Sequence, residues 1–351
     1  MFQSHGNLFL NPKAGLLFVD FELGSVLQLS GEAVVKDEPN RRFIQFDIQK
    51  VRWYSEGTLG TRWRFVEMSP YNPVLSNEQG KVASTFPMRV KVTRIVNESF
   101  QVKTFRFVTP APVKFLPGQY ATFQFDRITR YDDDSIVENV VRTWTISETA
   151  ASFNGDTFIE ITVKRKDNGL VSRYLHDKVQ IEFDNIHLLG IDGDMSPIIQ
   201  SEPSKYVPTA PPKIVIVTAG IGITVGASIL RGLRGLGFPD TEILFIHTSR
   251  NTAEIPFANE LVRRGTKDAS LQFRLLLTGE SIDSSNPLEP FVVKSQKRLE
   301  NSLIKELVGE FASRNTHAYV VGPGSFDRDI SESLVANGIL ADHVHVEHFN
   351  F

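Results

Sequence analysis

The stretch Lys213–Leu230, KIVIVTAGIGITVGASIL, joins an apolar run, a glycine turn and a helix-like segment. The run Ile214–Val217 is continuously apolar and rich in β-branched residues, as is typical of a parallel strand covered on both faces. Gly220 and Gly222 let the backbone turn sharply and approach a ligand closely. The segment that follows, Val225–Leu233, would direct its free N–H groups towards a phosphate. The stretch therefore predicts a nucleotide-binding βα unit.

Taken alone, the same stretch also fits a buried βα unit without a ligand, or a membrane span. A span is disfavoured because the uncharged run Ile214–Leu230 is shorter than the roughly 20 apolar residues required and is interrupted by glycines and threonines. The glycine spacing is G-x-G-x-x-x-G, which differs from the dinucleotide fingerprint G-x-G-x-x-G. The rest of the chain must decide between the first two interpretations.

Length and composition narrow the function classes. A chain of 351 residues suits two or three domains. The net charge of −3 gives no basic field for nucleic acid. No charged and then apolar leader opens the sequence, so we expect a cytoplasmic protein. The absence of cysteine excludes disulfides, thiolate nucleophiles and Cys-ligated iron–sulfur clusters within these residues, so electron transfer here would need an organic cofactor.

Changes of pattern divide the chain. Residues 1–71 contain strand-like runs, and residues 72–85 form a polar linker. Residues 86–195 contain closely spaced strands, which favour an antiparallel barrel. Residues 196–212 are rich in Pro and Ser and form a second linker. In residues 213–351 strands alternate with helical segments, which predicts a parallel sheet with crossover helices.

The strand-like motif RTWTIS, residues 142–147, carries three side chains suited to a flat, phosphorylated ligand. Arg142 can clamp a phosphate, Trp144 can stack on a ring, and Thr145 can form a hydrogen bond with a ring nitrogen. An ordinary amphipathic strand would show the same alternation. The motif needs its neighbours to become specific.

Three more motifs surround it in the chain. Lys164 ends a strand-like run, and Gly169-Leu170-Val171-Ser172 opens a helix-like segment whose N-terminus could bind an anion. A strand, a turn and a capped helix that bind no ligand would show the same sequence pattern. The turn signal PGQY at residues 117–120 precedes both, and VVGP at residues 320–323 lies near the C-terminus.

In this order the motifs resemble those of the ferredoxin-NADP reductase superfamily over Phe86–Phe351. The resemblance implies an antiparallel flavin-binding β-barrel followed by an α/β parallel-sheet nucleotide-binding domain, with FAD and NAD(P)H as cofactors. By position, Arg142 would bind the flavin phosphate, Trp144 would stack on the isoalloxazine, and Thr145 would lie near its N5. The other residues implied to bind a cofactor are Lys164, Gly169, Val171, Ser172, Gly220, Gly222, Thr224, Gly322, Pro323 and Phe349. The residues implied to act in catalysis are Thr145, Thr224 and Glu347, the last from a match of residues 347–349 to the family's C-terminal E-x-F.

Three residues depart from the family pattern. Trp144 replaces a tyrosine, Val225 replaces a proline, and Val321 replaces a cysteine near the hydride-transfer position. The last change bears on the rate more than on the reaction, because the hydride passes directly between cofactor atoms.

The residues after the second strand of the α/β domain bear on nucleotide choice. Ser249-Arg250 follows EILFIHT, and an arginine there suits the 2′-phosphate of NADP, whereas an acidic residue suits NAD. We therefore predict NADPH, with NADH as the alternative. A solvated loop charge is the other interpretation of Arg250.

Near the C-terminus, His343, His345 and Glu347 share one face of a predicted strand. Two imidazoles and a carboxylate could bind a metal, but terminal histidines are more often simply exposed. We predict no metal site.

Residues 1–71 resemble the second half of a pyridoxamine 5′-phosphate oxidase-like split barrel, which implies a partial split β-barrel and a homodimer through this β segment. Half a barrel leaves open sheet edges and little core. The segment would then pack on the rest of the chain or on a second copy.

Together these features predict a flavin-dependent NAD(P)H oxidoreductase that passes electrons to a protein or small-molecule acceptor. The alternatives are a flavin- or nucleotide-binding scaffold without turnover, and a reductase subunit that serves only a protein acceptor.

Overall fold

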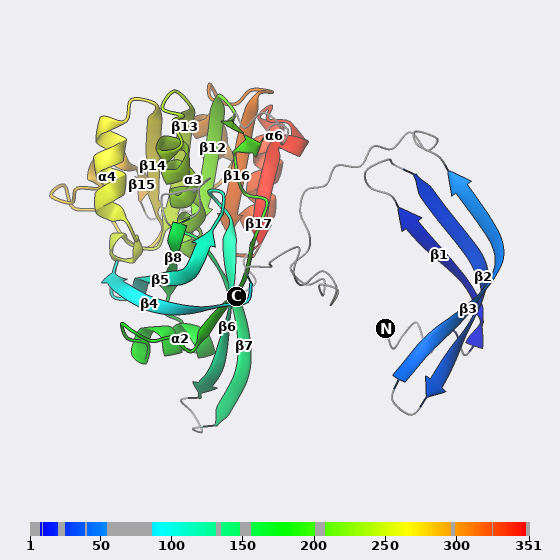
Figure 1. The fold of residues 1–351 in the computed structure, drawn as a ribbon. Helices are drawn as coiled ribbons and strands as arrows, with labels where there is room; N and C mark the ends of the chain where they lie inside the picture. The colour runs from blue at the N-terminus through cyan, green and yellow to red at the C-terminus, as the bar shows by residue number, and fades with distance from the viewer. Residues whose placement is uncertain are drawn as a thin grey trace. The chain divides into compact units, whose positions relative to one another are not determined.

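Figure 1 shows the fold in a computed structural model of the chain. The structure describes residues 8, 10–19, 25–38, 41–54, 86–130, 135–147, 156–200, 208–295, 299–324 and 326–348. The chain divides into two compact units, Met1–Pro73 and Val74–Phe351.

The first unit contains a three-stranded antiparallel sheet in the order β1-β2-β3. Its strands are β1 (Lys13–Val19), β2 (Val26–Glu38) and β3 (Arg41–Tyr54). The register pairs Leu16 with Leu29 and Leu29 with Val51, so these apolar residues share one face. The strands expected in residues 1–71 are present, and the resemblance of this segment to a split barrel stays a prediction.

The second unit begins with a curled antiparallel sheet in the order β7-β6-β9-β4-β5-β8, here called the barrel. Its strands are β4 (Met88–Asn97), β5 (Val102–Val113), β6 (Tyr120–Thr129), β7 (Ile136–Thr145), β8 (Asp156–Lys164) and β9 (Ile186–Asp192). An isolated bridge joins Ile146, just after β7, to Ile161 within β8, and so links the two outer strands. Buried side chains such as Phe105, Phe123 and Ile159 fill the interior.

The chain then forms a six-stranded parallel sheet in the order β15-β14-β13-β12-β16-β17, which with its helices is called the α/β domain. The strands are β12 (Lys213–Ala219), β13 (Glu242–Ser249), β14 (Leu271–Leu277), β15 (Val292–Ser295), β16 (Thr316–Gly322) and β17 (Val344–His348). The expected fold class, with a β segment, an antiparallel barrel and a parallel α/β sheet, is confirmed.

Helices cover both faces of this parallel sheet (Figure 1). Helices α3 (Ile223–Gly235) and α4 (Ala258–Lys267) pack on one face, and α5 (Asn301–Val308) and α6 (Phe326–Ala336) on the other. Among the helices that the structure describes, none is both long and apolar enough to cross a bilayer.

The segment expected to be the second linker contributes to the α/β domain. Met195 and Ile198 are buried in the core that α3 and α4 cover. Two short strands, β10 (Ile199–Gln200) and β11 (Pro208–Thr209), then pair with each other. The chain therefore packs on the α/β domain before residue 196.

The strand order reverses between β12 and β16, and ligands of open parallel sheets bind where the order reverses. The short 3₁₀ turn η1 (Gly220–Gly222) follows β12 at this point. A Cβ on Gly222 would lie 2.7 Å from the carbonyl oxygen of Val321, so glycine lets the turn approach β16. The sequence that predicted a nucleotide turn is therefore placed at the reversal point.

Candidate functional site

A cavity of about 910 Å³ lies between the barrel and the α/β domain. Its lining side chains come from β6, β7, β8 and β17, from the loop before helix α2 (Leu170–Asp177), and from the start of α3. The lining residues are Tyr120, Arg142, Thr143, Trp144, Thr145, Thr162, Lys164, Lys166, Asn168, Gly169, Leu170, Val171, Ser172, Ile221, Thr224 and Glu347. A cavity of this size falls within the range of cofactor and ligand sites.

Strand β7 provides one wall with three kinds of side chain. Arg142 is exposed, and its guanidinium donates a hydrogen bond of 2.7 Å to the carbonyl of Val141. Trp144 is half-buried, and its ring meets that of Phe125 edge-on at a centroid distance of 6.0 Å. Thr145 is only 3% exposed, and its Oγ1 has no hydrogen-bond partner among the described residues. A buried hydroxyl without a partner is unusual and indicates that a ligand atom or a water belongs there.

The loop from β8 to α2 provides a backbone cradle. Gly169 is the N-cap of α2 and offers no side-chain cap, so the first N–H groups of the helix are left for another acceptor. A Cβ at Gly169 would overlap Oγ of Ser172, and that Oγ accepts a hydrogen bond of 3.2 Å from the Lys166 amide. This loop therefore suits an anion near the helix N-terminus.

Two lysine side chains lie at this end of the cavity, and one of them is paired with a carboxylate. Lys164 donates a hydrogen bond of 2.6 Å to Glu254, which lies in η2 (Thr252–Glu254) of the α/β domain. Burial, helped by the positive charge of Lys164, lowers the pKa of Lys166. An anionic group beside Lys166 would counteract both burial and the charge of Lys164, because it would stabilise the charged amine and raise its pKa.

The α/β domain provides the opposite wall. Gly220 has a φ of +54°, and a Cβ there would meet open space, so its conformation and not crowding calls for glycine. Oγ1 of Thr224 donates a hydrogen bond of 2.9 Å to the carbonyl of Ile221 and so closes the turn.

Glu347 enters this wall from β17. Its Oε2 is buried without a hydrogen-bond partner among the described residues. Burial, with a smaller contribution from Asp194, raises the pKa of Glu347 to about 7. The carboxyl is therefore poised to hold or release a proton near neutral pH.

Most of the predicted site residues meet in this one cavity. Those that line it are Arg142, Trp144, Thr145, Lys164, Gly169, Val171, Ser172, Thr224 and Glu347. Gly220 and Gly222 flank the lining residue Ile221 in η1. Ser249, Arg250, Gly322 and Pro323 lie at or just after the carboxyl ends of β13 and β16 and do not line the cavity. Phe349 lies outside the described residues.

The other lining residues were not named as site residues, although Leu170 and Ile221 fall within turns predicted to bind the cofactors. They are Tyr120, Thr143, Thr162, Lys166, Asn168, Leu170 and Ile221. Thr162 precedes Lys164 by two positions on β8, so strand alternation could have found it. Lys166 and Asn168 precede Gly169 in the loop, and a lysine shortly before a helix N-terminus was a usable signal for an anion site.

The C-terminal histidines lie outside this cavity. His317 on β16, which the sequence did not single out, stacks on His343 with a ring-centroid distance of 4.0 Å. Its Nδ1 lies 3.2 Å from Nε2 of His345. The expected strand face of His343, His345 and Glu347 is only partly present, because His343 lies in the 3₁₀ turn η4 (Ala341–His343) before β17. Glu347 lines the cavity and the two histidines do not.

Comparisons with known proteins bear on the module as a whole. No family model matches the sequence. The chain is 26% identical over 265 residues to the glycine betaine monooxygenase reductase subunit of Chromohalobacter salexigens, covering 74% of this chain and 63% of that protein. It is 25% identical over 272 residues to flavohemoprotein A of Dictyostelium discoideum, covering 74% and 59%. The chain thus spans about three fifths of the length of these curated relatives.

Solved structures share the fold. The FAD/NAD-binding domain of nitric oxide dioxygenase from Vibrio cholerae is 25% identical, with a TM-score of 0.57, and the match covers 75% of this chain and 99% of that domain. A ferredoxin NADP⁺ reductase from Neisseria gonorrhoeae shows the same fold at 17% identity, with a TM-score of 0.54 and coverage of 74% and 97%. A barrel, a parallel α/β domain and a cavity between them define this class of two-domain module. Over about three quarters of its length the chain is similar to these reductases and flavohemoproteins, in agreement with the resemblance to the ferredoxin-NADP reductase superfamily.

Proposed function

We propose that this chain is a flavin-dependent oxidoreductase that takes a hydride from NAD(P)H and passes electrons to an external acceptor. The observation that carries the proposal is the cavity, which combines an aromatic ring, an unpartnered threonine hydroxyl, a positive helix N-terminus and a carboxyl of raised pKa. FAD matches this set, because it offers a flat ring, ring nitrogens and a pyrophosphate. When bound, FAD supplies hydride acceptance and one- or two-electron release.

The residues of the cavity divide this work. Arg142 and Lys166 neutralise phosphate charge, while the amides that follow Gly169 hold the pyrophosphate. Trp144 flanks the ring, and Oγ1 of Thr145 forms a hydrogen bond at its edge. The pyrophosphate cradle favours FAD over FMN.

The wall formed by Ile221, Thr224 and Glu347 faces the incoming nicotinamide. The turn Gly220–Gly222 leaves room for the nucleotide backbone, and Gly322-Pro323 begins the loop beside it. Glu347 exchanges a proton near the reacting atoms, because its carboxyl is partly protonated at neutral pH.

For the nucleotide we propose NADPH, with NADH as the weaker substrate. Arg250 follows β13 directly and is exposed, so its guanidinium is available to a 2′-phosphate. Burial opposes ionisation of the neighbouring Glu254, but Lys164, Asn251 and, least of all, Arg250 hold the pKa of that carboxyl below its usual value.

For the acceptor we propose a protein partner. Three curated relatives are named reductase subunits of a monooxygenase, and this chain has no cysteine to hold an iron–sulfur cluster of its own. We also propose a cytoplasmic location.

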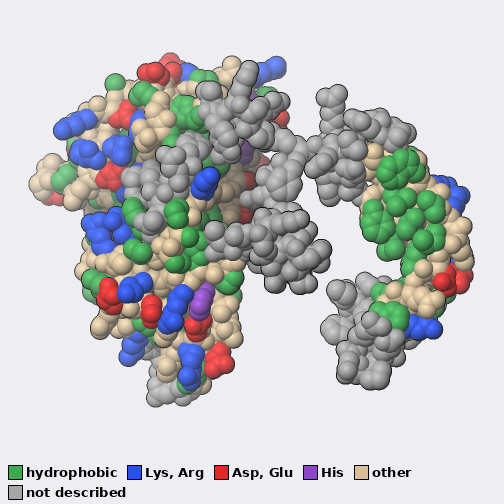
Figure 2. Space-filling model, viewed as in Figure 1, with side chains coloured by type: hydrophobic (Ala, Val, Ile, Leu, Met, Phe, Trp, Pro, Cys, Tyr) green, Lys and Arg blue, Asp and Glu red, His purple; other side chains and the backbone are tan. Residues whose placement is uncertain are grey.

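A homodimer through the N-terminal sheet is a further part of the proposal. Its apolar face includes Leu16, Val51 and Trp53, which are 40%, 58% and 62% exposed. Figure 2 shows hydrophobic side chains gathered on one side of this sheet. A face of this kind needs a cover, and a second copy supplies one of the same shape.

Cofactor binding by flavin-free protein tests the function. Titration calorimetry should give stoichiometric FAD binding that is at least about tenfold tighter than FMN binding, since one phosphate and its contacts are lost with FMN. Arg142→Ala should weaken the binding of both, and the matched change Arg127→Ala, on the exposed surface of β6, should weaken neither. Failure of the folded wild-type protein to bind either flavin would favour a scaffold without turnover.

A further inference from the structure

Helix α3 joins the two walls of the cavity. Its N-terminal turn carries Thr224, and two later turns contact the barrel on the same side of the helix. Oγ of Ser228, which is fully buried, accepts a hydrogen bond of 3.0 Å from the amide of Gly118. At Gly232 a Cβ would overlap the ring of Pro117, so glycine permits this close approach. The PGQY motif is thus the docking point for α3.

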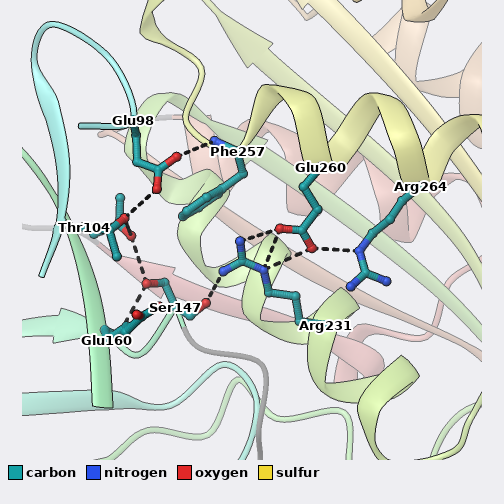
Figure 3. A network of polar contacts seen from close by, with 9 residues as sticks. Glu98, Thr104, Ser147, Glu160, Arg231, Phe257, Glu260 and Arg264 are labelled. Atoms are coloured by element: carbon teal, nitrogen blue, oxygen red, sulfur yellow. Dashed lines mark hydrogen bonds and ion pairs between the residues drawn. The ribbon is translucent and has the colours of Figure 1, made fainter. Parts of the chain in front are cut away.

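Arg231 also bonds to the barrel and is held by α4 (Figure 3). Its Nη1 donates a hydrogen bond to the carbonyl oxygen of Ser147, two residues beyond the end of β7. Its Nε and Nη2 donate to Glu260 on α4, with a shortest distance of 2.6 Å. The guanidinium also lies 4.2 Å from the centroid of the Phe257 ring. The side chain is only 10% exposed, so water screens these contacts weakly.

The residues around Arg231 are held in turn. Glu260 also accepts a hydrogen bond of 2.7 Å from Arg264, which holds the carboxylate from its other side. Oγ of Ser147 lies 2.9 Å from Oγ1 of Thr162 in the barrel. A second link runs from Glu98 of the barrel to the amide of Phe257, at 3.3 Å.

Arg231 lies close to residues of both walls of the cavity. Trp144 and Thr145 lie within three residues of the carbonyl that Arg231 holds. Thr224 lies seven residues before Arg231, which is about two turns, or roughly 10 Å, along the same helix. This bond, together with the contacts that Ser228 and Phe257 make with the barrel, sets how far the walls stand apart.

We propose that Arg231 is a positioning residue that sets the separation between the Trp144–Thr145 wall and the Gly220–Thr224 wall. The inference rests on the proposed function, in which these walls hold the hydride acceptor and the hydride donor. Transfer requires the two atoms at near-contact distance, and a misplacement of about 1 Å can slow such a step by roughly a hundredfold. Only a planar guanidinium can reach the Ser147 carbonyl and both oxygens of Glu260 at once.

Arg234 offers a matched control on the same helix. Its guanidinium donates one hydrogen bond of 2.7 Å to Asp268 and another of 2.7 Å to the carbonyl of Phe238. Its side chain is 12% exposed. Its bonds to Asp268, Phe238 and Thr241 all stay inside the α/β domain. Arg231→Met and Arg234→Met therefore remove similar bonds, but only the first removes a bond between the walls.

The test compares both variants in anaerobic stopped-flow reduction of the flavin-loaded protein and in hydrogen exchange of the flavin-free protein. Arg231→Met should slow flavin reduction about tenfold or more and change the isotope effect with 4-deuterated nucleotide, while nucleotide Kd and flavin content stay within about twofold. Amide exchange at the end of β7 and in the first turns of α3 should rise in this variant without any cofactor. Arg234→Met should change neither the reduction rate nor the exchange at the end of β7.

Equal reduction rates in the two variants would overturn the proposal, as would slower reduction with no extra exchange at the end of β7. If Arg231→Met does not fold, Arg231→Lys replaces it, because lysine keeps the charge but lacks the planar guanidinium. This variant should show the same changes in reduction rate and amide exchange, but smaller ones. Wild-type protein that binds flavin but is not reduced would contradict the proposed function. In that case, the exchange comparison alone would still confirm or overturn the positioning role.

Discussion

At the scale of single residues, Thr145 and Thr162 are two buried threonines in the same cavity with opposite surroundings. Thr145 Oγ1 has no partner among the described residues, whereas Thr162 Oγ1 lies 2.8 Å from Thr104 Oγ1 and 2.9 Å from Ser147 Oγ. Thr145→Val should therefore change the unfolding free energy of the flavin-free protein by no more than about 0.5 kcal/mol. The same change should slow flavin reduction about tenfold, because a bond to the ring is lost.

Thr162→Val is the matched control. It should lower the unfolding free energy by about 1–2 kcal/mol, because two hydrogen bonds are lost and their partners stay buried. Denaturant melts of the flavin-free variants measure this difference. Equal losses of stability at the two positions would show that Thr145 is bonded within the protein and is not reserved for a ligand.

Glu347 makes stability depend on pH. Its pKa rises from 4.5 in the unfolded chain to about 7 in the fold because of burial. Below pH 4.5 the carboxyl is neutral in both states. As the pH rises towards 7, the unfolded chain ionises first, so stability is lost, and above about 7 the loss is complete.

Glu347→Gln removes this titration. The variant should melt at a higher temperature than the wild type at pH 8, and the difference should vanish at pH 4.5. Thermal melts of flavin-free protein across this range give the result. A difference that does not change with pH would contradict the raised pKa.

At the scale of elements, the contact between β16 and β17 includes a histidine stack, in which the ring of His317 lies against those of His343 and His345. Burial, followed by the nearby His343 and His345, lowers the pKa of His317 from 6.5 to about 4, although Asp342 acts in the opposite direction. The stability due to this stack is complete above pH 6.5 and is lost as the pH falls towards 4, because the unfolded chain takes up the proton first.

His317→Phe keeps a stacked ring and removes the charge. Between pH 7.5 and pH 5 its melting temperature should fall less than that of the wild type, and hydrogen exchange in β17 should rise less. The sign is opposite to that for Glu347, so each variant isolates one group. An equal fall in both proteins would place the acid sensitivity elsewhere.

Sequence reasoning predicted the elements whose patterns are local. The strands of the barrel and the alternation of the α/β domain follow from runs such as TFRFVT and IVIVT. Strand β9 was missed because IHLLGID sets apolar residues next to one another, while its position between β6 and β4 depends on long-range pairing. The two-stranded pairing near residue 200 was missed for the same reason.

In the site, too, the residues that could be predicted are those with a local signal in the sequence. Motif residues such as Arg142 and Gly169 carry special side chains or backbone freedom, and they line the cavity. The role of Arg231 could not be found from the sequence, because its partner is a backbone carbonyl 84 residues away, which any residue provides. Tertiary packing decides such contacts.

At the scale of the whole molecule, the N-terminal sheet predicts self-association. Val51→Lys with Trp53→Glu places charges on its apolar face, and Arg52→Glu changes a charge on the opposite face. The wild type and Arg52→Glu should be dimers by light scattering on a sizing column, and the double variant should be a monomer with an unchanged flavin content. A monomeric wild type, or a dimer in the double variant, would contradict the homodimer.

The central claim concerns the second unit, where two subdomains place a flavin and a nicotinamide against each other. Anaerobic titration of the flavin-loaded protein with NADPH and with NADH, followed by visible absorbance, tests it most directly. The account predicts stoichiometric bleaching of the flavin band by NADPH at a lower concentration than by NADH, with this preference lost in Arg250→Ala. A flavin band that neither nucleotide bleaches would contradict the account.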